Sequence, residues 1–240
     1  MSLSKRRILV TGAARGLGEI FARALAEAGA DLILADVLAE EGRAVARDLG
    51  AVFSPVDLRD PQSIATLGAQ IEGPLHGLLD NSAVATGIGG IGFEDVDTWN
   101  HVMEVNVRGT WLMIRAFAPQ LLASGTGRIV NVASDTALWG AQKLMSYVAS
   151  KGAVISMTRA LARALGPDNV GVTAIAPGIL TTESTKYVSR ARHALHEDGR
   201  AVPGPQPPDD LSATVTFLLS EGALTLTGQV LPVNRGFVFT

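Results

Sequence analysis

The most constraining feature of the sequence is an apolar run that leads straight into a glycine-rich turn. Residues 8–18 read ILVTGAARGLG, so an apolar strand over 8–10 precedes Gly12, Gly16 and Gly18 in a G-x-x-x-G-x-G spacing. Apolar side chains then recur with helical spacing over residues 17–28. Glycines between a strand and a helix let the backbone approach a pyrophosphate at the helix N-terminus. This stretch therefore predicts the first half of a dinucleotide-binding βαβ unit.

A carboxylate ends the next expected strand. Residues 31–35 are mostly apolar and stop at Asp36, which lies eighteen residues after Gly18. At about this spacing, a carboxylate accepts hydrogen bonds from the adenosine ribose hydroxyls of NAD. A 2′-phosphate would bring like charge close to Asp36, and the next residue, Val37, supplies no balancing cation. Asp36 therefore predicts NAD over NADP.

Strand-like and helix-like segments alternate along the rest of the chain, as βαβ units require. Further strands are expected over 51–56, 75–79, 127–132, 170–176 and 229–233. Helices are expected over 39–49, from Pro61, over 98–122, from Tyr147 to about 165, and over 209–220. The 240 residues suit one domain spanning 1–240. We expect a Rossmann-type, doubly wound α/β fold, with a seven-stranded parallel sheet and helices on both faces.

A second pattern concerns three polar residues, Ser134, Tyr147 and Lys151. Tyr147 and Lys151 are four residues apart, so in a helix they share one face. A phenol has a reference pKa near ~10, and a nearby ammonium favours the phenolate. A tyrosine in this setting can exchange a proton at a carbonyl or alcohol oxygen, and the Ser134 hydroxyl can bond to the same oxygen. Taken alone, the Tyr–Lys spacing is also common on ordinary amphipathic helices.

Together the two patterns resemble the short-chain dehydrogenases/reductases. The resemblance rests on Thr11-Gly12-x-x-x-Gly16-x-Gly18 and Tyr147-x-x-x-Lys151, in this order, and spans nearly the whole chain. It implies a catalytic set of Asn106, Ser134, Tyr147 and Lys151. By this resemblance, Asn106 shapes a local irregularity in its helix and supports a proton relay to Lys151. A core asparagine satisfied by the backbone would explain Asn106 equally well.

The resemblance also implies which residues contact the cofactor. They are Gly12, Arg15, Gly16, Leu17, Gly18, Asp36, Val37, Asp57, Leu58, Asn81, Tyr147, Lys151, Pro177, Gly178, Ile179 and Thr182. Arg15 favours the phosphorylated cofactor, because a basic residue in the glycine turn can meet a 2′-phosphate in this family. The family's Asn-Asn-Ala-Gly loop reads Asp80-Asn81-Ser82-Ala83 here, so the Asp80 carboxylate needs a partner.

The substrate site is less defined by sequence. Leu138, Trp139 and Leu144, with Ala141, are candidate walls of a partly apolar pocket, although some could belong to the core. Residues 183–208 fit no sheet element, and by resemblance they form a substrate-covering lobe. We expect an NAD-dependent oxidoreductase that interconverts a secondary alcohol and a ketone. The alternatives are an NADPH-dependent ketoreductase, such as a 3-oxoacyl thioester reductase, and a non-catalytic dinucleotide-binding regulatory protein.

The composition and the apolar segments bear on which ligands the protein binds, where it is located and whether its chains associate. The net charge of -3 gives no reason to expect nucleic-acid binding, and no metal site is expected from zero cysteines and four scattered histidines. His193 and His196 could share a helix face, for which a solvated surface is the simpler interpretation. No signal peptide or membrane span is visible, so we expect a cytoplasmic protein. The apolar helix 98–122 and the tail FVF at 237–239 suggest buried subunit contacts in a homotetramer.

Overall fold

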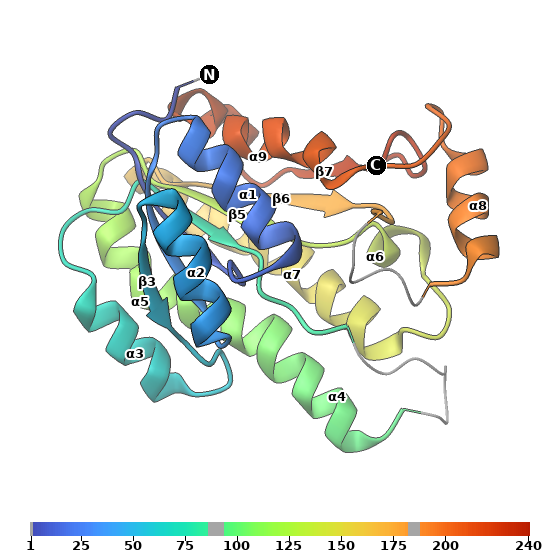
Figure 1. The fold of residues 1–240 in the computed structure, drawn as a ribbon, viewed down its shortest axis with the longest axis horizontal. Coiled ribbons are helices and arrows are strands. Elements are labelled where there is room, and N and C mark those ends of the chain that lie inside the picture. Colours follow the sequence, from blue (N-terminus) through green and yellow to red (C-terminus); the bar gives the residue numbers. More distant parts are fainter. Residues whose placement is uncertain (1, 86–93, 182–187) are drawn as a thin grey trace.

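The fold is built on one parallel sheet, described here from a computed structural model that covers residues 2–85, 94–181 and 188–240. Within these residues the strand order is β3-β2-β1-β4-β5-β6-β7, and every neighbouring pair is parallel (Figure 1). The strands are β1 (Arg7–Thr11), β2 (Asp31–Asp36), β3 (Val52–Pro55), β4 (Gly77–Asp80), β5 (Arg128–Val132), β6 (Gly171–Pro177) and β7 (Val230–Val233).

Helices cover both faces of this sheet. They are α1 (Gly16–Glu27), α2 (Ala39–Leu49), α3 (Pro61–Gln70), α4 (Val96–Met103), α5 (Thr110–Ala123), α6 (Thr136–Trp139), α7 (Met145–Leu165), α8 (Arg190–Gly199) and α9 (Ser212–Leu218). Side chains alternate along a strand, so Ile8 and Val10 join one core cluster and Leu9 the other. The first cluster includes α1, α2 and α9 side chains, and the second includes those of α3, α5 and α7. The expected seven-stranded, doubly wound fold is confirmed.

The strand order reverses between β1 and β4, which are hydrogen-bonded neighbours. On one side of this point the chain runs outward through β2 and β3, and on the other it runs through β5, β6 and β7. In open α/β sheets, ligands bind in the crevice beyond the carboxyl ends of the strands at such a reversal. The fold thus places the candidate site above β1 and β4.

The helix expected over 98–122 is interrupted. It consists of α4, a π-helical turn over Glu104–Gly109 and α5, in one continuous path. Asn106 lies in the wide turn and bonds outward to the backbone of Val84. A Cβ on Gly109 would lie 2.8 Å from the Leu58 Cβ, so a glycine is required where this helix passes the loop. The irregularity implied by the family resemblance is confirmed.

Two other expected helices also differ from the structure. The helix predicted over 209–220 begins as a 3-10 turn at Pro208–Leu211, and its α-helical part ends at Leu218. Proline has no N–H and is tolerated in a first turn. The segment 183–208 holds no strand in its described part, as expected, but it contains α8, which stands to one side of the sheet in Figure 1.

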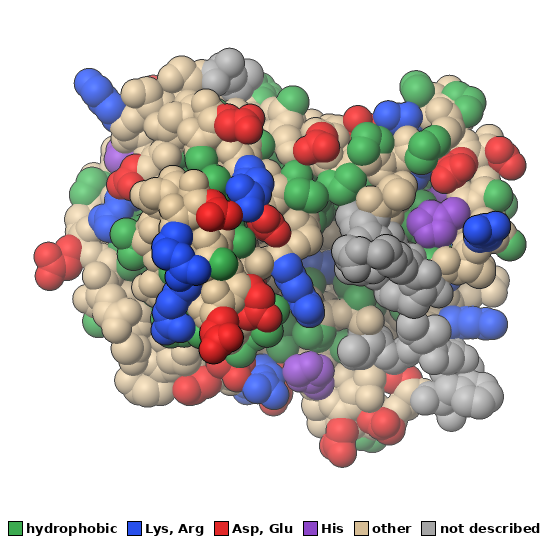
Figure 2. All heavy atoms as spheres, in the orientation of Figure 1, with side chains coloured by type: hydrophobic (Ala, Val, Ile, Leu, Met, Phe, Trp, Pro, Cys, Tyr) green, Lys and Arg blue, Asp and Glu red, His purple; other side chains and the backbone are tan. Residues whose placement is uncertain are grey.

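The surface carries charges of both signs. On the face seen in Figure 2, acidic and basic side chains are interspersed over α1 and α2. This agrees with the small net charge. Among the described helices, none is both long and apolar enough to cross a membrane.

Candidate active site

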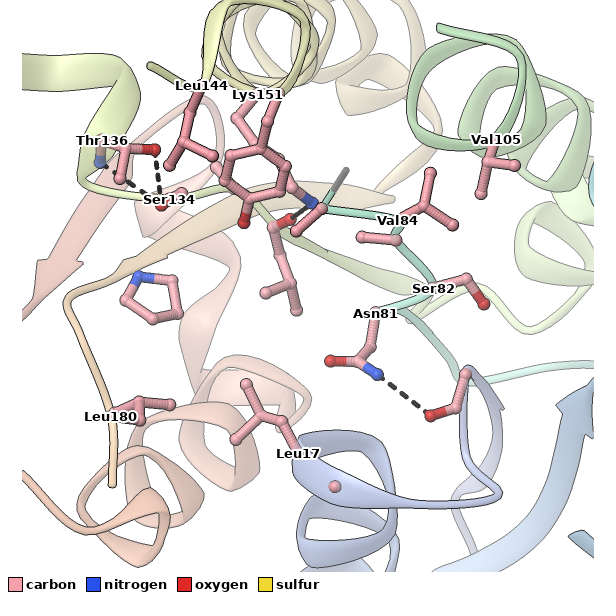
Figure 3. Close-up of a pocket in the computed structure, with 18 of the residues that line it drawn as sticks. Leu17, Asn81, Ser82, Val84, Val105, Ser134, Thr136, Leu144, Lys151 and Leu180 are labelled. Atoms are coloured by element: carbon pink, nitrogen blue, oxygen red, sulfur yellow. Dashed lines mark hydrogen bonds between the residues drawn. The ribbon is translucent and has the colours of Figure 1, made fainter. Parts of the chain in front are cut away.

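A cavity of about 1540 Å³ lies at the carboxyl ends of the central strands. It is lined by the turns that follow β1, β2, β3, β4, β5 and β6, together with parts of α7 and α8. Figure 3 shows Leu17 on one side of this space, Asn81, Ser82 and Val84 on a second, and Ser134, Leu144 and Lys151 on a third. Residues far apart in the sequence are thus brought around one cavity.

The glycine turn leaves room for a ligand. Gly12 and Gly16 have φ values of +64° and +59°, which favour glycine. A Cβ on Gly16 would meet nothing within 4 Å, so this backbone faces open space. A Cβ on Gly18 would lie 1.9 Å from the Gly12 carbonyl oxygen, so Gly18 allows close packing of α1 and does not line the cavity. The N-cap Arg15 makes no side-chain cap, which leaves N–H groups of α1 for an anion such as a pyrophosphate.

Asp36 ends β2 and lines the cavity beside this turn. Its Oδ2 accepts a hydrogen bond from the Ala14 N–H at 2.9 Å, and its Oδ1 accepts one from the Leu38 N–H at 3.0 Å. Each carboxylate oxygen has a second lone pair, so ribose hydroxyls can still donate to it. Asp36 therefore fixes the shape of the turn and keeps acceptor capacity facing the cavity.

Three further residues predicted to contact the cofactor lie in the neighbouring part of the cavity. Val37, Asp57 and Leu58 line it, as the resemblance implied, and Arg15 lies at its edge with an exposed side chain. Arg59, which was not singled out from sequence, pairs with Asp57 at 2.7 Å and holds the pKa of that carboxyl below its usual range. Since the pair is half exposed, solvent screens most of its effect on stability.

The atypical loop after β4 is organised by Thr11. The Thr11 hydroxyl donates to Asp80 Oδ1 at 2.8 Å and accepts hydrogen bonds from the Asn81 and Ser82 N–H groups. The Asn81 side chain donates to the Gly12 carbonyl oxygen at 3.2 Å. Burial raises the pKa of Asp80, while its hydrogen bonds and Lys151 act against that rise. One oxygen of Asp80 is thus hydrogen-bonded to Thr11, and the nearby charge of Lys151 opposes the effect of burial on its pKa.

Lys151 lies beneath the cavity in α7 and is only 3% exposed. Its Nζ donates to the Val132 carbonyl oxygen at 2.6 Å and lies 5.7 Å from the centroid of the Tyr147 ring. Burial lowers the pKa of Lys151 to about 8, and the charge of Asp80 acts in the opposite direction. The four-residue spacing therefore does bring ammonium and phenol together on one face of a helix.

Ser134 follows β5 and faces the same cavity as Tyr147. The Ser134 oxygen accepts a hydrogen bond from the Thr136 hydroxyl at 2.9 Å (Figure 3). A hydroxyl has one proton and two lone pairs, so Ser134 can also bond to a substrate oxygen in the cavity that it lines. Ser134, Tyr147 and Lys151 all line one space with the glycine turn.

Asn106 lies behind the cavity wall rather than on it. Its Oδ1 accepts from the Val84 N–H at 2.8 Å, and its Nδ2 donates to the Val84 carbonyl oxygen and to the Ser150 hydroxyl. Asn106 is fully hydrogen-bonded on its amide and ties the loop after β4 to α7. Both interpretations made from sequence, a backbone-satisfied asparagine and a support for the site, are compatible with this position.

The substrate end contains two of the three predicted pocket residues. Trp139 and Leu144 line the cavity, with Pro177, Gly178 and Ile179 nearby. Leu138 does not line it, because its side chain packs on the cluster of Ala133, Val154, Ile155 and Ala174. Ala141 is buried and also does not line it. Thr182 lies outside the described residues.

The prediction that His196 lies on a solvated surface is wrong. His196 is 1% exposed, lines the cavity and stacks on Phe237 with ring centroids 4.1 Å apart. Its neighbour one turn earlier, Arg192, also lines the cavity and was not singled out from sequence. The four-residue spacing was visible, but only the fold shows which face of α8 meets the site.

Comparisons with known proteins agree with this geometry. A family model described as Enoyl-(Acyl carrier protein) reductase matches residues 12–238. A trans-4-hydroxycyclohexanecarboxylate dehydrogenase of Sinomonas cyclohexanicum is 31% identical and covers 98% of this chain and 93% of its own. A short-chain type dehydrogenase/reductase structure from Mycobacterium ulcerans covers 99% of this chain and 91% of its own, at TM-score 0.94 and 25% identity. The chain belongs to the short-chain dehydrogenase/reductase family.

Two other similar proteins are named with NAD or NADH. An NAD-dependent glycerol dehydrogenase of Listeria innocua is 30% identical over 98% of this chain and 95% of its own. A 3-ketoacyl-(acyl-carrier-protein) reductase of Brucella melitensis, complexed with NADH, has TM-score 0.91, 29% identity and coverage of 99% and 100%. As a short-chain dehydrogenase/reductase, this chain is an oxidoreductase that binds a nicotinamide dinucleotide.

Proposed function

We propose that the protein is an NAD-dependent oxidoreductase that interconverts a secondary alcohol and a ketone, with Tyr147 as general acid/base. The observation that carries the proposal is the shared cavity. Ser134, Tyr147 and Lys151 line it together with the open glycine turn and Asp36. A proton-transfer group thus adjoins a space shaped for a dinucleotide.

Each side chain has a distinct part in this proposal. When bound, a nicotinamide dinucleotide accepts the hydride in oxidation and donates it in reduction. Tyr147 exchanges the proton of the substrate oxygen, and the Ser134 hydroxyl donates a hydrogen bond to that oxygen. The buried ammonium of Lys151 favours the phenolate form and holds the ribose. Asn106 acts indirectly, by fixing the loop at Val84 and the start of α7.

The preference for NAD rests on Asp36. Both of its oxygens are held by backbone N–H groups, so the carboxylate cannot easily turn away from a 2′-phosphate. At an effective dielectric of 20, two unit charges 4 Å apart repel by about 4 kcal/mol, and solvent reduces this figure. The relative named as NAD-dependent supports the same choice.

A second candidate is an NADPH-dependent ketoreductase, such as a 3-oxoacyl thioester reductase. The exposed Arg15 at the cavity edge favours it, as do the name of the matching family model and the likeness to a 3-ketoacyl reductase. A related structure from Beutenbergia cavernae, 31% identical, holds NADP at low occupancy. A non-catalytic dinucleotide-binding role is the least supported, since all four members of the implied catalytic set are present.

The sequence also led us to infer a cytoplasmic homotetramer with a substrate-covering lobe over 183–208. The lobe is supported by Val188, Ser189, Arg192 and His196, which line the cavity from that segment.

The test is the absorbance of reduced nicotinamide. Purified protein is given NAD or NADP with a panel of secondary alcohols, and NADH or NADPH with the matching ketones. NAD reduction by at least one secondary alcohol supports the proposal. Turnover confined to NADPH and ketones would favour the second candidate, and no turnover with any pair would favour the non-catalytic one.

A further inference from the structure

Helix α8 brings a cation and an imidazole against the end of the cavity where Ser134 lies. Arg192 and His196 are one helical turn apart, and both line the cavity with Trp139. The Arg192 guanidinium lies 5.8 Å from the centroid of the Trp139 ring. The His196 ring meets Trp139 edge-on at 5.7 Å. These contacts form an aromatic wall with a positive charge beside it.

Within residues 2–85, 94–181 and 188–240, the positive charge of Arg192 has no direct partner. Among the described residues, its guanidinium makes no hydrogen bond and no ion pair, and its side chain is only half exposed. A second cation, the exposed Lys143, lines the same end of the cavity. Arg192 thus keeps all five N–H donors for a ligand.

One carboxylate, Asp135, also lines this end, and each of its oxygens accepts one hydrogen bond from the wall itself. Oδ1 accepts from the Trp139 indole N–H at 3.4 Å, and Oδ2 accepts from the Asn234 amide at 3.2 Å. Asp135 is fully buried, and burial raises its pKa to about 6. It stabilises the wall from behind and lowers the local positive charge without closing an ion pair with Arg192.

His196 adds unused hydrogen-bonding capacity at the same place. Neither ring nitrogen has a partner within the described part of the chain. Burial is the main cause that lowers the pKa of His196 to about 4, and Arg192 is the second. The ring is therefore neutral at pH 7, with one N–H donor and one acceptor. Both ring nitrogens are buried, so His196 contributes to this wall as a neutral ring stacked on Phe237.

We propose that this end of the cavity binds a carboxylate carried by the substrate. The substrate is then a secondary alcohol or ketone with a carboxylate on an apolar body, away from the reacting carbon. The planar guanidinium of Arg192 matches a carboxylate with two parallel hydrogen bonds. Trp139 and Leu144 contact the apolar body. This inference rests on the proposed function, because it assigns the substrate of the same site.

The first experiment compares an acid with its neutral ester. NAD reduction is measured with 3-hydroxybutyrate, 4-hydroxycyclohexanecarboxylate and the methyl ester of each. The acid should have the higher kcat/KM by about tenfold or more, which is the size expected for a charge-assisted hydrogen bond. Arg192→Leu should remove this advantage, leave the esters within about twofold, and leave the Kd for NADH unchanged.

Matched variants and a binding measurement separate the outcomes. Arg190→Leu, on an exposed part of the same helix, should keep the preference for the acid. Arg192→Lys should keep part of it, since charge remains without the planar fork. Equal turnover of acid and ester would overturn the inference and leave the proposed function standing.

If no alcohol is oxidised, the binding of cyclohexanecarboxylate to NADH-saturated protein is measured by calorimetry. Binding to the wild type that is lost in Arg192→Leu supports the carboxylate site. No binding to the wild type overturns it.

Discussion

The buried Asp80 carboxylate is the side chain by which this site departs most from its family's pattern. Its Oδ1 is bonded to Thr11, and Oδ2 is buried without a partner among the described residues. Asp80 also interacts with the Lys151 ammonium, whose pKa burial lowers to about 8. A negative charge here favours the protonated form of Lys151, so Asp80 opposes the effect of burial.

Asp80→Asn therefore should move the alkaline limb of the kcat/KM profile to lower pH. The sign follows from the charges: without the carboxylate, the ammonium loses an attraction, the pKa of Lys151 falls further below 8, and its charge is lost earlier as pH rises. Asparagine keeps an acceptor for Thr11. Asp57→Asn, which removes a carboxylate paired with Arg59 elsewhere in the cavity, is the matched control. A limb that stays in place or moves to higher pH contradicts this account of Asp80.

Asp36→Asn should weaken the preference for NAD over NADP. The amide keeps the size of the side chain and one acceptor but removes the charge that a 2′-phosphate would face. We expect the ratio of kcat/KM for NAD over NADP to fall by about tenfold or more, in line with a screened charge repulsion. Steady-state kinetics with both cofactors and a fixed alcohol give the ratio. A wild-type enzyme that already favours NADP would refute the role given to Asp36.

The polar residues were predictable to different degrees. Ser134, Tyr147, Lys151 and Asp36 have characteristic spacings, because each follows a strand or lies on a helix face, and the structure brings them to one cavity. Arg192 and His196 were not assigned, because their place depends on how α8 docks against Trp139 and Phe237. Such contacts between distant segments have no local sequence signal.

The pattern of the sequence predicted several helices and strands closely. The expected bounds of α2 are those observed, β1 is longer than predicted by one residue at each end, and β5 begins one residue later than predicted. The largest difference is the interruption of the helix expected over 98–122. Apolar periodicity continues through the π-helical turn, so composition alone did not locate it, and only the resemblance did, through Asn106.

Asn106→Ala should destabilise the protein through this turn. It would leave the half-buried N–H and carbonyl groups of Val84 without their partner, and an unmatched group costs about 1–3 kcal/mol when fully buried and less when solvent reaches it. Urea unfolding measures the loss as a lower midpoint. The exposed Asn100 in the same helical run is the control, and Asn100→Ala should change stability by less than about 0.5 kcal/mol. Equal stability of the two variants would show that the Asn106 amide is not needed to hold the loop.

The whole molecule leaves apolar surface along the interrupted helix. Trp99 and Trp111 are 38% and 45% exposed, and Leu122 at the end of α5 is similar. The apolar helix from which subunit contacts were predicted therefore keeps apolar side chains exposed in the single chain. Phe237 of the tail packs on His196, whereas Phe239 is largely exposed. A partner chain would remove both kinds of apolar surface from water.

We predict a closed homotetramer in solution. Light scattering should give four times the 25.0 kDa mass of one chain at micromolar concentration. Trp111→Glu should shift the mass towards smaller species, because a charge would then be buried in the interface. Val52→Glu, on the exposed edge strand β3, should leave the mass unchanged. A wild-type particle of one chain would refute the tetramer.

The central claim is that Tyr147 exchanges the substrate proton beside a bound dinucleotide, and Tyr147→Phe tests it most directly. Phenylalanine keeps the ring beside Lys151 and removes only the hydroxyl. With the best alcohol of the panel, kcat should fall by about 10²-fold or more, while the Kd for NADH, followed by its fluorescence, stays within about twofold of wild type. Turnover close to that of the wild type, with NADH binding intact, would contradict the account.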